Sequence, residues 1–157
     1  MRHHWLVKSE PDAFSWEQQA ASGVEPWTGV RNATARNNLA AMRLGDLAFF
    51  YHSNIGKEIV GVVEVARETY PDPTADASPQ KGKKPRGGPG GGNAGNWVCV
   101  DMKAVGPMPK PVSLATIKAD PYFADFALVR QSRLSVMPVS KAHWDRLCRM
   151  GGWPVGE

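Results

Sequence analysis

The chain contains 157 residues, of which 42% are hydrophobic and 22% are charged. This length is that of one ordinary domain, and the near-average composition excludes a disordered protein. No apolar run approaches the roughly 18 residues that cross a bilayer, and the first residues lack the apolar core of a signal peptide. We therefore expect one domain over residues 1–157, soluble and cytoplasmic, with no membrane partner.

The formal net charge of +4 is concentrated in one stretch of low complexity. Residues 78–96 contain no acidic side chain and four basic ones, namely Lys81, Lys83, Lys84 and Arg86. Glycine and proline dominate the same stretch, so the sequence predicts a flexible insertion at about residues 76–96. The insertion is either a cationic arm that contacts phosphates or a solvated linker, and the sequence leaves both interpretations open.

A strand and a short helix are predicted at the start of the chain. The strand lies around residues 5–9 and ends before Pro11. Ser15 begins the helix with the spacing of a capping box, and Gly23 ends it. Residues 24–31 then read as a loop.

A second helix, over about residues 33–43, precedes a β-hairpin. The hairpin joins a strand at 46–52 to a strand at 58–66 through a short turn that contains asparagine and glycine. A further strand over 97–105 is expected to end where prolines recur, at Pro107, Pro109 and Pro111.

Serines mark the last two helices, which Ser113 and Ser140 cap. Their expected spans are 114–119 and 141–150, with a strand over 132–139 between them. Short strands with helices at the edges, and no alternation of strand and helix, favour an α+β fold. A small, partly closed β-barrel of about five to six strands is the natural arrangement at this length.

Motifs for enzymatic and metal chemistry are missing from the sequence. It contains no G-x-S-x-G, H-E-x-x-H or Walker A pattern, and its two cysteines are too far apart for a C-x-x-C motif. The histidines lack the spacing of metal ligands, and His3 and His4 are expected in a frayed terminus. Lys8 and Ser9 would point to opposite faces of a strand, which argues against a Ser/Lys nucleophile. We therefore expect no metal, no cofactor and no catalysis.

Four polar segments stand at the ends of predicted elements, where their side chains can converge on the mouth of a barrel. They are Lys8 to Glu10, Trp27 to Asn32, Tyr51 to Asn54, and Arg130 to Arg133. Together they supply aromatic rings, short hydrogen-bonding groups and cations. These are the groups that stack on a flat heteroaromatic ring, read its edge and hold the flanking phosphates.

Each of these residues also has a purely structural interpretation. Trp27 fits a hydrophobic core, Asn32 a helix cap, Arg31 a surface ion pair, and His52 a buried imidazole with a hydrogen-bond partner. The case for a site therefore rests on the four segments meeting around one slot.

The same segments resemble the EVE domain family. The similar strings are WLVKSEP (5–11), WTGVRNATARNNLAAMRLGD (27–46), FFYHSN (49–54), EIVGVVEV (58–65), YPDPT (70–74) and LVRQSRLSVMPVS (128–140). Their order and length cover the chain from about residue 3 to residue 153, apart from the glycine-rich stretch. The resemblance implies a PUA-like β-pseudobarrel with a pocket for a modified nucleobase. This sequence differs from the family pattern at Ala33, where a bulky aromatic residue is common, and at residues 78–96.

The resemblance also assigns roles to residues of this chain. Trp27 is the expected stacking wall, and Tyr51 and His52 complete the cage. The base edge is expected to be read by Ser9, Asn32 and Ser53, and the rim to be closed by Gln131, Ser132 and Arg133. Phosphate or rim contacts are expected from Lys8, Arg31, Arg133 and the four cations of the insertion.

The resulting hypothesis is a monomeric, non-catalytic reader domain. Its partner is nucleic acid, either DNA with modified cytosine or RNA with a modified base, and the base is flipped out of its strand. Two alternatives remain open: an enzyme or enzyme accessory that acts on small nucleoside-like molecules, and an interaction module that binds a peptide.

Overall fold

The structure is a computed structural model that describes residues 3–12, 14–72, 97–131 and 133–153. The predicted insertion, with Lys81, Lys83, Lys84 and Arg86, lies outside these ranges, as does Ser132. Among the residues that the structure describes, no helix has the length and apolar character to span a membrane.

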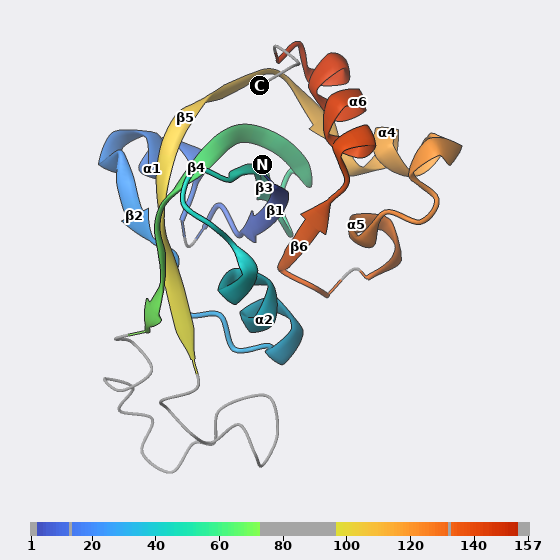
Figure 1. Cartoon of the computed structure of the whole chain (residues 1–157). Coiled ribbons are helices and arrows are strands. Elements are labelled where there is room, and N and C mark those ends of the chain that lie inside the picture. The colour runs from blue at the N-terminus through green and yellow to red at the C-terminus, as the bar shows by residue number, and fades with distance from the viewer. Residues whose placement is uncertain (1–2, 13, 73–96, 132, 154–157) are drawn as a thin grey trace.

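Six strands form one mixed sheet, which confirms the α+β expectation. Their order across the sheet is β2 (Val24–Pro26), β5 (Val98–Ser113), β4 (Glu58–Pro71), β3 (Leu47–His52), β1 (His4–Ser9) and β6 (Val136–Val139). Strands β1 and β3 pair in parallel, and every other pair of neighbours is antiparallel. Register shifts recur along β4 and β5, and such bulges bend a sheet. Figure 1 shows β5 arching over the other strands.

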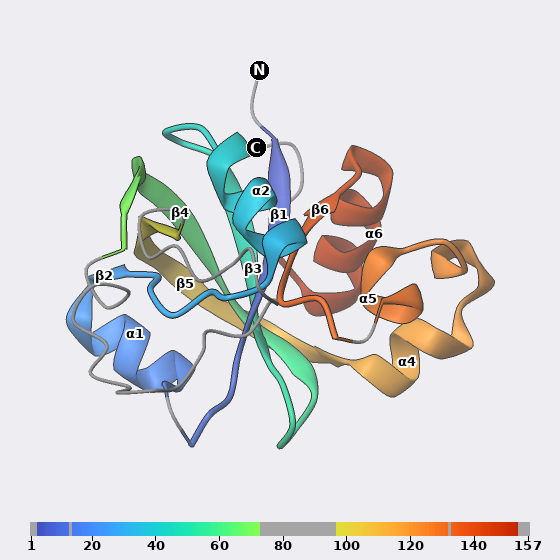
Figure 2. The same cartoon turned by 90° about the horizontal axis from the view of Figure 1, so that it is seen from below.

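Helices cover the sheet on both sides. Figures 1 and 2 show α1 on one side and α4, α5 and α6 together on the other, with α2 between them. Their bounds are α1 (Trp16–Ser22), α2 (Ala33–Ala41), α4 (Leu114–Ala119), α5 (Ala127–Arg130) and α6 (Lys141–Gly151), and a 3₁₀ turn covers Pro121–Phe123. The predicted caps are confirmed, because the side chains of Ser15, Asn32, Ser113 and Ser140 each accept a hydrogen bond from an amide of the first turn.

Strand β3 forms the centre of the core because five of its six residues are buried. Neighbouring strand residues point to opposite faces, so its two phenylalanines serve different sides of the sheet. Phe49 stacks on Trp144 of α6, with ring centroids 3.9 Å apart. Phe50 meets Trp16 of α1 and Trp27, both edge to face, at 5.4 and 5.5 Å. The face that carries Phe50 is therefore the face that positions the loop after β2.

Strand β5 continues through the three prolines that were expected to end it. That expectation was wrong because β2 pairs with β5 only at Asp101–Lys103, which leaves the later half of β5 at an edge of the sheet. A proline that lacks an N–H costs little on an edge strand. The sequence patterns identified these residues as breakers without information on which strands would flank them.

Three smaller expectations also need correction. Residues 24–26, read as a loop, pair with β5 and form β2. The last strand begins at Val136 and not at residue 132, because a four-residue helix, α5, precedes it. His4 is not in a frayed terminus: it lies in β1, is 6% exposed, and its ring is 4.4 Å from that of Trp144.

Candidate functional site

Seven of the ten predicted site residues that the structure describes line three hollows near the C-terminal end of β1, whereas Arg31, His52 and Ser53 line none of the three. No single hollow is lined by all four polar segments, so the expectation of one common slot was wrong. The first hollow brings together Ser9 and Trp27, with Lys8, Glu10, Phe14, Glu25, Pro26 and Thr28. Lys8 and Ser9 both line it, although they were expected to face opposite sides of the strand, because the hollow lies at the end of β1. It has a volume of about 360 Å³. Strand β1 supplies one wall, and β2 with the loop after it supplies the other.

Trp27 lies deep in the wall of this hollow. The residue is 8% exposed, and its ring packs edge to face on Phe14 and Phe50. The backbone N–H of Trp27 donates to the carbonyl of Val100 at 2.7 Å, which holds the loop against β5. The indole is therefore a firmly held surface, part of the core and part of the hollow at once.

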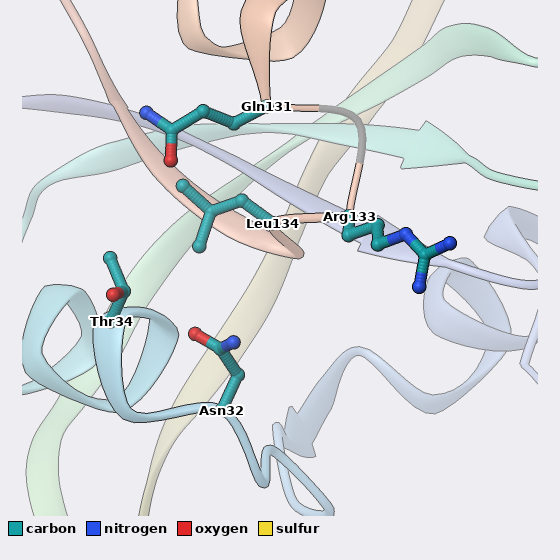
Figure 3. Close-up of a pocket in the computed structure, with 5 residues that line it drawn as sticks. All are labelled: Asn32, Thr34, Gln131, Arg133 and Leu134. Atoms are coloured by element: carbon teal, nitrogen blue, oxygen red, sulfur yellow. The ribbon is translucent and has the colours of Figure 1, made fainter. Parts of the chain in front are cut away.

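The second hollow brings together three more predicted residues, Asn32, Gln131 and Arg133, with Thr34 and Leu134. Figure 3 shows Asn32 and Thr34 at the start of α2 facing Gln131 and Leu134 across the hollow, while Arg133 extends away from Gln131. The side-chain oxygen of Asn32 accepts from the amide of Ala35 at 2.9 Å, so one of its polar groups caps α2. Asn32 and Gln131 are both exposed residues.

Tyr51 belongs to a third hollow, which it shares with Lys8. Tyr51 is 2% exposed, and burial raises the pKa of its hydroxyl to about 12. Lys8 lines both the first and the third hollow, with its ammonium 5.8 Å from the ring of Tyr51. Burial lowers the pKa of Lys8. Lys8 therefore lies between the first hollow and the third hollow and lines both.

His52 makes a hydrogen bond within the fold. Its Nε2 accepts from the backbone N–H of Trp16 at 3.0 Å, which fits the structural interpretation of this residue. Burial lowers the pKa of His52, and the carboxylates of Glu17 and Glu58 oppose that decrease. Next to it, the backbone N–H of Ser53 donates to the carbonyl of Ser9 at 3.0 Å, and the hydroxyl of Ser9 donates to the carbonyl of Phe14 at 2.5 Å.

The hydrogen bond of His52 makes a testable contribution to stability. Burial lowers the pKa of His52 in the folded protein below its unfolded value near 6.5, and a protonated Nε2 could not accept from the N–H of Trp16. The unfolded chain then binds more protons, and stability decreases as the pH falls below about 6.5. A His52→Gln variant keeps an acceptor without titrating. We expect the difference in Tm between variant and wild type to shift in favour of the variant between about pH 8 and pH 5, measured by thermal unfolding. A constant difference across this range would contradict the assignment.

Asp72 anchors the loop that carries Trp27 and Asn32. Its Oδ2 accepts from the backbone N–H of Gly29 at 2.8 Å and from Nη1 of Arg31 at 3.0 Å. The side chain of Asp72 is fully buried, and that of Arg31 is 23% exposed. Gly29 has a φ of 84°, a conformation that glycine adopts without strain. Arg31 therefore does form an ion pair, but with a buried carboxylate and not at the surface as foreseen, and the pair connects the loop to Asp72.

Asp72 was not among the predicted site residues, although it lies in the string YPDPT. A carboxylate between two prolines signals a specific structural role, but nothing local indicates that its partners are residues 29 and 31. The two segments meet because β4 pairs with β5 on one side, up to Pro71, and β2 pairs with β5 on the other, up to Pro26. The described residues contain no group of three or more histidine, cysteine, aspartate or glutamate side chains that could hold a metal ion.

The pattern that defines the EVE domain matches residues 3–150. The chain belongs to the EVE domain family. Thymocyte nuclear protein 1 of Gallus gallus is 35% identical over 90% of this chain and 66% of its own length. This chain therefore spans about two thirds of that curated relative.

Solved structures of the same fold share this similarity. The protein Rpa0253 of Rhodopseudomonas palustris is 53% identical, with a TM-score of 0.80 over 96% of this chain and 93% of its own. The structure of human THYN1 in complex with DNA that contains 5-methylcytosine is 30% identical, with a TM-score of 0.82 over 97% of this chain and 99% of its own.

Proposed function

We propose that this EVE domain binds DNA that carries modified cytosine and acts as a non-catalytic reader. The observation that carries the proposal is the complex of human THYN1 with 5-methylcytosine DNA, because that protein matches this chain over nearly its full length. The site supports the proposal through its chemistry, which is that of a ring-binding hollow with polar edges.

We place the base in the first hollow. Trp27 offers an indole face held by Phe14 and Phe50, and stacking of a base on an aromatic ring contributes about 1–3 kcal/mol. Glu10 and Glu25 line the same hollow, and carboxylates accept from the exocyclic amine of cytosine. Lys8 is placed to donate to a ring acceptor. These groups suit cytosine better than thymine, which presents a carbonyl in place of the amine.

The second hollow suits the strand beside the base. Asn32, Gln131 and Arg133 present amide and guanidinium groups, and this hollow is lined by no carboxylate among the described residues. Side chains of this kind contact sugar and phosphate and fix the register without reading sequence. The base must leave its stack to enter the first hollow, at a cost of a few kcal/mol.

The preference for a methylated base is expected to be modest. One buried methyl group contributes about 0.8 kcal/mol, which corresponds to about a fourfold difference in affinity. The measurement is a fluorescence titration of duplexes that are identical except for one cytosine or 5-methylcytosine, with the matching RNA as a third arm. Equal affinity for the two DNA duplexes would contradict the reader function, and tighter binding of the RNA would move the function to RNA.

A further inference from the structure

A hollow rich in lysine lies beside the candidate base site, between the β3–β4 turn and α4. It consists of the third hollow and an adjoining one, which have volumes of about 230 and 330 Å³ and share Lys57, Leu114 and Lys118. Figure 2 shows α4 and α5 next to the β3–β4 hairpin, on the side of β1 opposite α1. We refer to the combined surface as the lysine hollow.

The side chains of the lysine hollow are cationic or neutral. Lys8, Lys57 and Lys118 line it, and no carboxylate does so among the described residues. Asn54 and Tyr51 add an amide and a hydroxyl. No ion pair joins Lys57 or Lys118 to any acidic residue in the described part of the chain. By contrast, Lys141 is neutralised by Asp145 at 2.8 Å.

The turn that carries Lys57 is held in a defined conformation. Asn54 and Lys57 have positive φ values of 71° and 49°, which non-glycine residues seldom adopt. The carbonyl of Lys57 accepts from the amide of Leu114 at 2.9 Å, which ties the turn to the start of α4. Glu58 pairs with Ser113 in the sheet, and this pairing fixes the same junction. Such strain persists where the surrounding structure imposes it, and it is common at functional sites.

The lysine hollow is continuous with the candidate base site through Lys8, which lines both. On its other side, Leu128 of α5 contributes to the hollow, and α5 leads directly to Gln131 of the second hollow. The lysine hollow therefore adjoins the candidate base site at Lys8 and approaches the second hollow through α5.

We propose that the lysine hollow binds backbone phosphates of the DNA strand whose modified base occupies the site at Trp27, with Lys57 and Lys118 as the contacting residues. The inference rests on the proposed function, which it deepens by giving the strand its path. Phosphate contacts carry no sequence information, so this surface sets affinity and register while the first hollow sets the preference for the base.

The test compares the double variant Lys57→Ala/Lys118→Ala with wild type on a duplex that contains one 5-methylcytosine. Loss of two phosphate contacts is expected to reduce the slope of log K against log salt concentration by about 1.8 and the affinity by about tenfold at physiological salt. The ratio of affinities for methylated and unmethylated duplexes is expected to stay unchanged. Binding of the free nucleoside 5-methyldeoxycytidine, which has no phosphate, is expected to be unaffected.

The matched control is Lys103→Ala/Lys110→Ala, which removes two exposed lysines of β5 that line neither part of the hollow. If both double variants show the same affinity and the same salt slope, the lysine hollow is not a phosphate site, and the proposed function stands. A third outcome separates the two proposals. If wild type shows no preference for the methylated duplex, the reader function is contradicted. If the Lys57/Lys118 variant then still has a shallower dependence of log K on log salt concentration than the control, the phosphate site is retained. If wild type binds no DNA, both proposals are overturned.

Discussion

Replacing Trp27 with alanine is expected to lower the free energy of unfolding by about 3–5 kcal/mol and to abolish measurable preference for a modified base. The indole is 8% exposed and packs between Phe14 and Phe50, so its removal leaves a cavity beside the centre of the core. The same change removes the surface on which a base would stack. Urea unfolding gives the stability, and titration with the methylated duplex gives the affinity.

Two further variants separate the stacking role from the structural role. Trp27→Phe retains an aromatic face and is expected to retain part of the affinity. Trp144→Ala is the matched control, because Trp144 is 3% exposed and stacks on Phe49 on the opposite face of the sheet. We expect it to lose similar stability but no affinity, provided both variants are measured at a temperature where they are folded. A folded Trp27→Ala variant that binds as wild type does would show that the base stacks elsewhere.

The second large effect is expected at Asp72. Asp72→Ala removes a buried carboxylate that accepts from the Gly29 amide and from Arg31, and it leaves both donors without this acceptor. Breaking such a pair from one side costs about 3 kcal/mol, and we expect that decrease in the free energy of unfolding. Affinity for DNA is expected to fall as well, although Asp72 lines none of the three hollows, because the loop from Trp27 to Asn32 loses its anchor. Urea unfolding and duplex titration measure the two effects.

Two control variants accompany Asp72→Ala: one changes only the charge of Asp72, and the other breaks an ion pair at the surface. Asp72→Asn keeps an oxygen for Gly29 but loses the charge that pairs with Arg31, so an intermediate loss is expected. Asp145→Ala breaks an exposed pair with Lys141 one helical turn away, and such pairs contribute about 0.5 kcal/mol or less. Unchanged affinity in a folded Asp72→Ala variant would mean that the loop keeps its conformation without this anchor.

The local elements were predictable because their signals are local. A helix cap is a serine hydroxyl or an asparagine amide oxygen that accepts from a backbone N–H within three residues. Spacing alone was therefore enough to identify the caps Ser15, Asn32, Ser113 and Ser140. The β3–β4 hairpin was equally visible, since its turn and both strands are contiguous in sequence. The parallel pairing of β1 with β3 was not, because two helices and a strand separate them along the chain.

In the candidate site, too, local signals identified some residues, and long-range contacts decided the roles of others. Most of the described residues named from sequence line one of three hollows near the end of β1, but Arg31, His52 and Ser53 line none of them, and several of the residues also stabilise the fold. Asn32 caps α2, and His52 accepts from Trp16. Asp72 and Lys57, which sequence patterns did not identify, gain their importance from partners that are distant in sequence or on another element.

The sequence by itself determined the family, the caps, most strands and the polar residue types available at the strand ends, since these depend on composition, spacing and short motifs. The tertiary structure decided the strand order, the course of β5 through its prolines, the anchoring of the Trp27 loop by Asp72 and the joining of Lys57 and Lys118 in one hollow. The physical reason is that hydrogen-bond partners and burial are properties of long-range contacts. A residue's type limits what it can do, and the neighbours that folding brings to it determine which of those roles it takes.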